Sequence, residues 1–391
     1  METLLDRLLG RIDRAEFRRS HLGRAPLHVK GPPDLVAGLM SWDGMSRLMS
    51  MTGIWTPDTL QVVMDCKMVP PSEYCGPGPS ASGGEAQRPD PAKVQALIRR
   101  GASVVLNGLE TLTPEIRALC NALREMTGGW VQANLYFSMR ERQAFAPHFD
   151  AHDVYAVHCS GEKTWQVFEG SEDAPVHAPA FTFGAQEMVR RAGRPVATYD
   201  LAPGDLLYIP RGRYHDALAS ANGAIHIAFG VTMPKALDLL SSVLWRHIVM
   251  NPEFRADLPV RPDATALAGA LARIGDSFAT MLGRDDVRAA VAALLRDFPM
   301  PTQGYDIAAL IAQDVRYEVA PGIRLAAKDG RTLLGKDKTW VEVPAGLERP
   351  IAWVLGRTEV TEAALGAAFS AMSRDQVREL VGNLRSMNVL R

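Results

Sequence analysis

The chain has 391 residues, a formal net charge of −1 at pH 7 and 47% hydrophobic residues, values typical of a globular protein with two or three domains. The near-zero charge does not favour nucleic acid as a partner, and no apolar stretch is long enough to span a membrane. The N-terminal residues lack the pattern of a signal peptide, so we expect a cytoplasmic protein. The four cysteines have no CxxC spacing, which fits a reducing compartment and disfavours a zinc finger.

The first third of the sequence is predicted to be mainly helical. Apolar residues recur at helical spacing near the N-terminus, at Leu4, Leu5, Leu8, Leu9 and Ile12. Further helices are expected at residues 35–40 and 45–51, followed by a strand at 60–64. Residues 91–99 and 113–126 are expected to form two more helices, because each begins with a capping residue and a proline.

Residues 68–92 differ in composition from the sequence on either side. Proline, glycine and serine crowd together there, and such a segment cannot bury a core. We therefore expect a mobile loop. Long loops are either functional or disordered, so a lid or substrate-recognition loop and a plain disordered insertion both stay open.

Strands are expected from residue 131 to residue 233, and the first motif in this region is Pro147-His148-Phe149-Asp150. Side chains alternate between the two faces of a strand. A strand through this motif would therefore present His148 and Asp150 on one face and direct Phe149 into the opposite layer. Such a strand would hold two polar side chains at a fixed separation.

The second motif ends in His215. It begins with a tight turn at residues 203–205, continues through a short apolar strand at 206–209 and passes a second turn at 210–212. We therefore expect His215 on a strand that neighbours the first motif. This pattern suits a small β-barrel whose mouth holds a binding site.

The two motifs together predict a metal site. Two imidazoles and one carboxylate on one face of a metal leave three positions open, as in the facial triad of non-haem Fe(II) oxygenases. A lone histidine is more often a hydrogen-bonded core or surface residue, so the prediction rests on His148, Asp150 and His215 as a set. Three ligands suffice, so His152 is interpreted as pocket wall and Trp165 as core packing.

Residues 101–234 resemble the JmjC-type, cupin-fold 2-oxoglutarate oxygenases, and among them the ribosomal-oxygenase branch often labelled cupin-4. The resemblance rests on six stretches: residues 101–107, Leu119-Cys120, 131–136, 148–155, 160–165 and 203–215. It implies an α+β protein with a double-stranded β-helix (cupin or jelly-roll) barrel. It also implies that His148, Asp150 and His215 are the catalytic metal ligands, with Fe(II) as the metal and 2-oxoglutarate and dioxygen as co-substrates.

The resemblance further implies that Lys163 binds the distal carboxylate of 2-oxoglutarate. A buried carboxylate needs a paired cation, although an ordinary exposed strand lysine is the competing interpretation. Lysine offers a point charge where arginine would offer two donors, so a hydroxyl or amide partner is expected nearby. Asn134, Tyr136 and His226 are the candidates, and each could instead be a hydrogen-bonded core group.

After Pro234 the sequence turns helical. Residues 235–250, 264–282 and 285–298 are rich in alanine and leucine at helical spacing. In similar proteins such helices form a dimerisation bundle, so residues 235–300 are assigned as a helical dimerisation region and a homodimer is expected. The alternative is a helical subdomain packed on its own barrel.

Residues 301–391 are predicted to form a winged-helix-like domain. Short strands at 315–319, 323–326 and 340–343 precede two helices, which are capped by Thr361 and Ser373. Modules of this kind can bind DNA. Arginines in the last helix are offset by acidic neighbours, so we do not expect nucleic acid to be a partner.

The resulting hypothesis has three domains, an oxygenase domain at 1–234, the helical region at 235–300 and the terminal domain at 301–391. The implied activity is that of an Fe(II)- and 2-oxoglutarate-dependent dioxygenase, which hydroxylates a C–H bond of an amino-acid side chain in a protein or peptide. In the family, the segment corresponding to 68–92 lies near the substrate entrance, and N-methyl demethylation is chemically possible. The alternatives are a tailoring hydroxylase of a free amino acid or peptide natural product, and a non-catalytic metal-binding cupin that senses or scaffolds.

Overall fold

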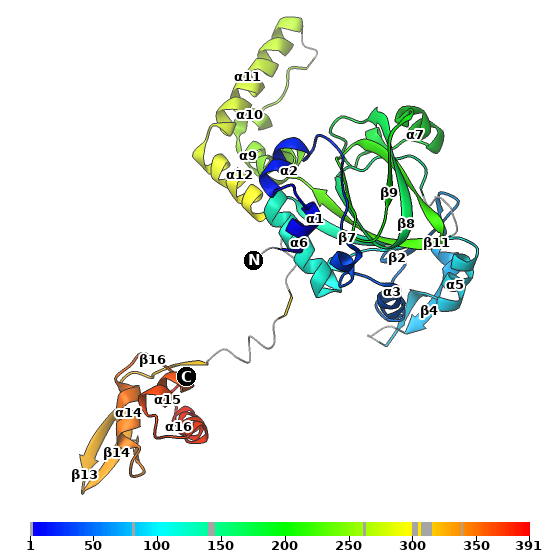
Figure 1. Cartoon of the computed structure of the whole chain (residues 1–391). Helices are drawn as coiled ribbons and strands as arrows, with labels where there is room; N and C mark the ends of the chain where they lie inside the picture. The colour runs from blue at the N-terminus through cyan, green and yellow to red at the C-terminus, as the bar shows by residue number, and fades with distance from the viewer. Residues whose placement is uncertain are drawn as a thin grey trace. The chain divides into compact units, whose positions relative to one another are not determined.

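The computed structural model describes residues 3–79, 83–139, 145–260, 263–298, 304–305, 315–337 and 339–391. The protein divides into two compact units, Met1–Gly304 and Tyr305–Arg391 (Figure 1). Both units combine helices with antiparallel strands, so the predicted α+β class is confirmed.

One large antiparallel sheet forms the centre of the first unit. Its strands follow the order β1-β10-β8-β11-β7-β6-β2-β3, and β9 pairs with the second half of β8. The strands are β1 (Leu27–Val29), β2 (Leu60–Met64), β3 (Lys67–Met68), β6 (Ser103–Leu106), β7 (Trp130–Ser138), β8 (Asp153–Ser171), β9 (Pro195–Leu201), β10 (Leu206–Ile209) and β11 (Arg213–Thr232). This sheet fits the predicted jelly-roll barrel, and the strand at 60–64 is confirmed.

The long strands β8 and β11 each contribute to two walls of the barrel. The first half of β8 pairs with β10 and its second half with β9, while the register between β8 and β11 shifts from Ala219 to Ala224. At this level Gly161 has φ +71°, and a Cβ atom there would lie 2.0 Å from the carbonyl oxygen of Gly223. Only glycine allows the two strands to approach so closely.

The N-terminal helices pack against one face of the sheet and bury the largest hydrophobic core. They are α1 (Leu4–Leu9), α2 (Arg14–Ser20), α3 (Trp42–Met49), α5 (Pro91–Arg99) and α6 (Pro114–Thr127). The predicted helices at 91–99 and 113–126 are confirmed. The predicted helices at 35–40 and 45–51 differ from the structure. Helix α3 begins earlier than predicted, because the Ser41 hydroxyl accepts the Gly44 N–H at 3.0 Å. A short 3-10 turn, Pro33–Val36, replaces the helix at 35–40.

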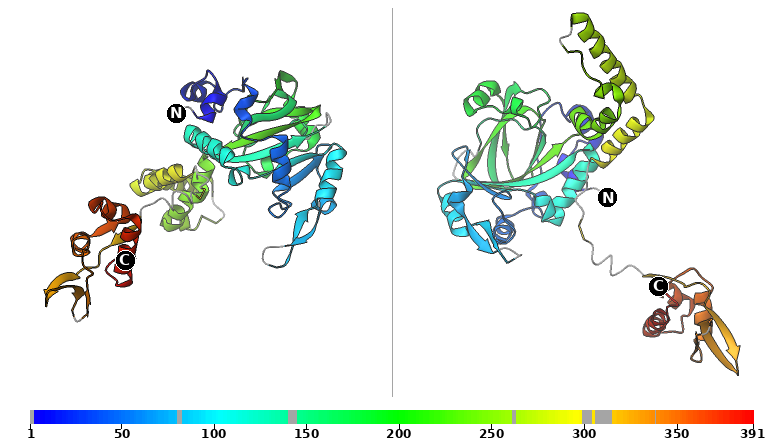
Figure 2. Two further views of the ribbon diagram at one scale, coloured as in Figure 1. Left: turned by 60° about the horizontal axis from the view of Figure 1, so that its bottom comes forward. Right: turned by 180° about the vertical axis from the view of Figure 1, so that it is seen from behind.

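The prediction of a loop at residues 68–92 is wrong for the part that the structure describes. A short helix, α4 (Pro71–Tyr74), leads into a hairpin of β4 (Cys75–Pro79) and β5 (Glu85–Pro89), while residues 80–82 lie outside the described residues. Figure 2 shows this hairpin extending away from the sheet beside α5. The prolines are tolerated because each strand of a two-stranded hairpin has an outer edge where no N–H is needed.

Helices also follow the barrel within the first unit. They are α8 (Ala236–Leu239), a π-helical turn (Leu240–Leu244), α9 (Trp245–Met250), α10 (Pro252–Arg255), α11 (Ala264–Leu282) and α12 (Asp285–Asp297). The three predicted helical stretches are therefore confirmed, the first with a π turn inside it. Among the described residues, no helix has the length and apolar character needed to cross a membrane.

The second unit holds a small core of its own. Its strands are β12 (Arg316–Glu318), β13 (Arg324–Lys328), β14 (Arg331–Lys336), β15 (Thr339–Glu342) and β16 (Glu359–Thr361), and its helices are α14 (Glu348–Leu355), α15 (Glu362–Ala368) and α16 (Arg374–Ser386). The three predicted strands and two predicted helices are present. The prediction missed β14, β16 and α14, and its residues 301–303, 306–314 and 338 lie outside the described residues.

Candidate metal centre

The His148–Asp150 segment is not a regular strand. His148 forms a single antiparallel bridge with His215 of β11, donating its N–H to the His215 carbonyl at 3.0 Å and accepting the His215 N–H at 2.8 Å. Asp150 lies beyond this bridge, and its carbonyl accepts the N–H of Gly212 at 2.9 Å. The predicted strand is therefore wrong, because only one residue of the motif pairs with a neighbouring strand. The placement of His215 on an adjacent strand is confirmed.

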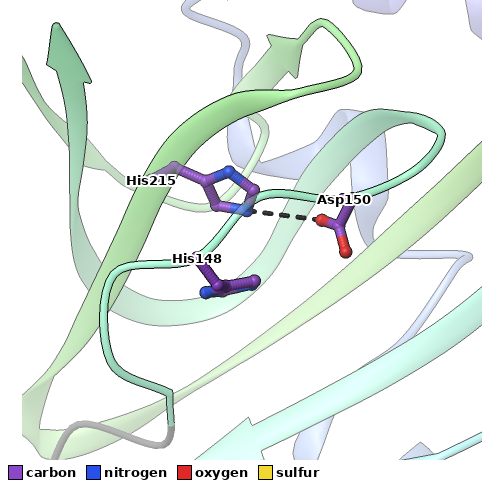
Figure 3. A group of neighbouring side chains, drawn as sticks. All are labelled: His148, Asp150 and His215. Atoms are coloured by element: carbon purple, nitrogen blue, oxygen red, sulfur yellow. Dashed lines mark ion pairs between the residues drawn. The ribbon is translucent and has the colours of Figure 1, made fainter. Parts of the chain in front are cut away.

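The three predicted ligands nevertheless converge (Figure 3). One ligand atom from each of His148, Asp150 and His215 lies within 4.8 Å of the others, and His215 Nε2 is 3.5 Å from Asp150 Oδ2. Phe149 points away into a separate cluster with Phe168 and Tyr214, as the alternation predicted. Two imidazoles and a carboxylate at this spacing can hold one divalent cation on a single face.

The ring nitrogens of both histidines have defined roles. His148 Nδ1 lies 2.9 Å from the carbonyl oxygen of Ala146, and His215 Nδ1 lies 3.0 Å from that of Arg213. A carbonyl can only accept, so each Nδ1 carries the proton and donates. Each Nε2 then keeps a lone pair for a metal, and the backbone fixes the ring orientation.

Electrostatics favour the metal-binding protonation states. Burial alone would raise the pKa of Asp150, but His152, His148 and His215 outweigh it and hold that pKa below its usual range. Burial and the nearby His148 lower the pKa of His215 to about 4. At neutral pH the carboxylate is therefore ionised and the imidazole neutral, which are the forms that bind metals.

A cavity of about 220 Å³ opens beside this cluster. Every residue that the sequence analysis named as a site residue lines it: Asn134, Tyr136, His148, Asp150, Lys163, His215 and His226. The sequence-based selection therefore identified residues from four separate segments that share one cavity.

Lys163 is buried in this cavity rather than exposed on a strand, with 4% of its surface accessible. Burial lowers its pKa to about 7. Among the described residues, no carboxylate lies within ion-pair distance of its ammonium group, and its hydrogen-bond partner is the Ser138 hydroxyl at 3.5 Å. A buried cation without a protein anion is a suitable partner for an anionic ligand.

Tyr136 and His226 pack face to face beside Lys163. Their rings are 4.9 Å apart and tilted by only 9°, and the two residues are cross-strand neighbours on β7 and β11. Burial lowers the pKa of His226 well below its usual range, so its ring is neutral. Its Nδ1 has no hydrogen-bond partner in the described part of the protein. Asn134 lies on the same face of β7, where its side-chain oxygen accepts the Gly108 N–H at 3.4 Å.

Sequence reasoning gave no site role to two residues beside Lys163: Ser138 was not named, and Trp165, which lines the cavity, was interpreted as core packing. Ser138 is buried beside Lys163 and also accepts from the Ser103 hydroxyl at 3.1 Å. Trp165 stacks on His215 at 5.9 Å, and its Nε1 has no partner among the described residues. Strand parity was the available signal, because Ser138 shares a face with Tyr136 and Trp165 shares one with Lys163. His152 lines the cavity, as expected for a pocket wall.

Residues 110–239 match the family model of the JmjC domain. The protein therefore has a JmjC domain. All seven predicted site residues fall inside it, as does the whole of β7 to β11. The resemblance stated from the sequence is confirmed.

Curated relatives align with part of this chain. The bifunctional lysine-specific demethylase and histidyl-hydroxylase NO66 of Drosophila simulans is 25% identical over 251 residues, 63% of this chain and 29% of that protein. The protein of the same name from Drosophila mojavensis is 30% identical over 166 residues, 41% of this chain and 18% of that protein. The aligned region thus spans less than a third of the length of these relatives.

The solved structure of Escherichia coli ycfD is similar across nearly the whole length. The alignment covers 97% of this chain and 98% of that one, with a TM-score of 0.51 and 17% sequence identity. This likeness shows that the two proteins share a fold around the JmjC domain.

Proposed function

We propose that this protein is an Fe(II)- and 2-oxoglutarate-dependent dioxygenase that hydroxylates a C–H bond of an amino-acid side chain in a protein or peptide. The observation that carries the proposal is the convergence of His148, Asp150 and His215 at one wall of a cavity. Three ligands on one face of Fe(II) leave positions for a co-substrate and dioxygen. Fe(II) bound there would supply the activation of dioxygen for C–H cleavage.

Lys163 supports the choice of a dicarboxylate as co-substrate. Its ammonium group is buried in the same cavity, and no carboxylate of the described residues lies beside it. We infer that it binds the distal carboxylate of 2-oxoglutarate, with Ser138, Tyr136 and the unpartnered Trp165 Nε1 as further donors. These donors would offset the cost of removing that carboxylate from water.

The names of the curated relatives support a substrate within a protein. Those relatives are described as histidyl-hydroxylases and lysine-specific demethylases, and both activities act on amino-acid side chains. We infer that this protein hydroxylates a side chain at the same kind of centre. A free amino acid or peptide natural product is the alternative substrate.

Turnover of 2-oxoglutarate tests the proposed activity. The purified protein with Fe(II) and 2-oxoglutarate should form succinate, and candidate peptides should increase the rate. Incubation with cell extract under ¹⁸O-labelled dioxygen, followed by mass spectrometry, should add one heavy oxygen to a protein side chain. Released formaldehyde would indicate demethylation instead, and label confined to small molecules would favour the natural-product alternative. Tight metal binding without any succinate would favour a non-catalytic sensor.

We also infer that residues 235–300 mediate a homodimer. Large apolar side chains are exposed along α8 to α11 and include Leu237, Leu240, Trp245, Val249, Met250, Leu267 and Leu271. Such a surface is typical of a protein interface. Sedimentation should give a dimer that Trp245→Glu converts to a monomer, whereas a monomeric wild type would contradict this inference.

We infer that the second unit is a winged-helix-like domain, because its described residues combine three helices with a three-stranded sheet. Arg378 pairs with Asp375 in α16, which offsets one of the three arginines of that helix, and we propose no nucleic-acid partner. All four cysteines lie in the described residues and none forms a disulfide, which supports a cytoplasmic location.

A further inference from the structure

We infer that Glu172 couples helix α7 (Ala185–Ala192) to the segments that carry the three metal ligands, so that this helix sets how tightly the centre holds its metal. The inference rests on the metal site of the proposed function. It makes Glu172 a positioning residue, because it acts through neighbouring residues and does not touch the metal position.

The segment that carries His148 and Asp150 needs such support because it has little regular structure, whereas His215 lies on β11. Only one bridge, between His148 and His215, joins them as a sheet. Behind the centre, Phe149 meets Tyr214 edge to face at 5.2 Å. Phe149 lies between the two ligands of the first segment, and Tyr214 directly precedes His215. Their contact therefore ties all three ligands to one aromatic cluster, which is completed by Phe168 and Ala192.

Glu172 connects this cluster to both neighbouring elements. Its carboxylate accepts the Tyr214 hydroxyl at 3.0 Å and pairs with Arg191 of α7 at 2.9 Å. Its backbone N–H donates to the Gly212 carbonyl at 2.9 Å, and the Gly212 N–H in turn donates to the Asp150 carbonyl. A continuous set of hydrogen bonds thus runs from α7 to both ligand segments.

Gly212 shows that this connection needs a specific backbone. It has φ +83°, and a Cβ atom there would lie 2.2 Å from the carbonyl oxygen of Glu172. The two backbone segments can approach only because residue 212 has no side chain. The close contact therefore depends on the sequence at this position.

Arg191 reaches the same cluster by a second route. Its guanidinium lies 4.0 Å from the centre of the Phe183 ring, and that ring is 6.2 Å from Phe149. The Glu172 side chain is only 15% exposed, so its pair with Arg191 is less screened than a surface pair. The adjacent Arg190 pairs with Glu187, as Arg191 also does at 2.7 Å. Arg190 is 72% exposed and shows no pair with Glu172 among the described residues, so it serves as the control.

Titration of the metal-free protein with Co(II) tests this inference. We expect Arg191→Ala and Tyr214→Phe each to weaken Co(II) binding by about tenfold, the lower range for loss of a partner that orients ligands. Both variants should also alter the visible absorption of bound Co(II). Arg190→Ala should leave affinity and spectrum unchanged. Thermal unfolding of the metal-free variants is measured in parallel.

The outcomes separate the inference from the proposed function. Failure of the wild type to bind Co(II) would overturn the metal site itself. Wild-type affinity and spectrum in Arg191→Ala and Tyr214→Phe would overturn the role of Glu172, even if their melting temperatures fall, because a purely structural contact affects folding alone. Tyr214→Phe removes one oxygen atom, so it tests the connection even if Arg191→Ala fails to fold.

Discussion

The two sides of the cavity are built in different ways. On the metal side, His148 and Asp150 come from an irregular segment that a single bridge and the Phe149 cluster hold in place. On the lysine side, Lys163, Tyr136 and His226 lie on long strands that pair with a neighbouring strand on each edge, although the β8–β11 register shifts after Ala219 and at His226. Trp165 contacts both sides through His215 and His226.

Because of this difference, we expect the geometry of the lysine side to be fixed and that of the metal side to be adjustable. Paired strands determine the separation of Lys163, Tyr136 and His226, because each backbone is hydrogen-bonded on both edges. The separation of the metal ligands depends on side-chain packing and on a few backbone hydrogen bonds from outside the sheet. We therefore expect the two sides to respond to mutation independently, metal affinity on one side and co-substrate affinity on the other.

The largest effect is expected on the metal side, from Asp150→Ala. This change leaves the two imidazoles and removes the carboxylate ligand of the cluster. Succinate formation should fall by about a thousandfold, equivalent to ~4 kcal/mol of transition-state free energy. Co(II) titration should show weakened binding. Asp276→Ala, at an exposed position on α11, is the control, and near-normal turnover in Asp150→Ala would show that the centre uses other ligands.

On the lysine side, Lys163→Met should raise the KM for 2-oxoglutarate by about a hundredfold. The change removes a charged hydrogen-bond donor, worth roughly 1.5–3 kcal/mol. Co(II) affinity should stay at the wild-type value, and the metal-free variant should be at least as stable, because a buried amine without an anionic partner has been removed. Exposed Lys67→Met is the matched control. A parallel loss of Co(II) affinity would refute the independence of the two sides.

Sequence reasoning succeeded where periodic structure determines position. Strand parity and turn residues were sufficient to place His215 on the strand after the turn at Gly212, and family resemblance added Lys163. Sequence reasoning failed for the His148–Asp150 segment, because the residues that hold this segment out of a regular strand are distant from it in sequence. Nothing local to Phe149 reveals that Glu172 and Gly212 fix the backbone beside it.

The error at residues 68–92 has a different cause. Composition predicted that this segment could not bury a core, but Val69, Tyr74 and Cys75 lie in the main hydrophobic core, and a hairpin needs only edge pairing. Ser138 was overlooked for a third reason, since a serine at the end of a strand carries no signal of its own. Its importance depends on Lys163, which is 25 residues away in sequence.

The pH dependence of co-substrate binding provides a third test. The pKa of Lys163 is lowered to about 7 by burial, so above that pH the free protein holds a neutral amine. A bound carboxylate favours the ammonium form, so binding takes up one proton. The affinity for 2-oxoglutarate should therefore fall up to tenfold per pH unit above about pH 7. Calorimetry of 2-oxoglutarate binding in two buffers of different ionisation heat should detect this proton uptake, and Lys163→Met should abolish it. Equal binding heats for the wild type in the two buffers would contradict the prediction.

The smallest effect is expected from Ser138→Ala. Its hydroxyl lies 3.5 Å from the Lys163 ammonium and accepts from Ser103 at 3.1 Å, so its loss removes one neutral hydrogen bond near the proposed carboxylate position. A neutral hydrogen bond contributes about 1 kcal/mol, so the KM for 2-oxoglutarate should rise about fivefold with no change in Co(II) affinity. Ser46→Ala on α3, outside this cavity, is the control. If the KM rose as much as in Lys163→Met, the Lys163 amine would act on the carboxylate only through the Ser138 hydroxyl. An ammonium group in direct contact with the carboxylate would instead retain most of the binding free energy after the hydroxyl is lost.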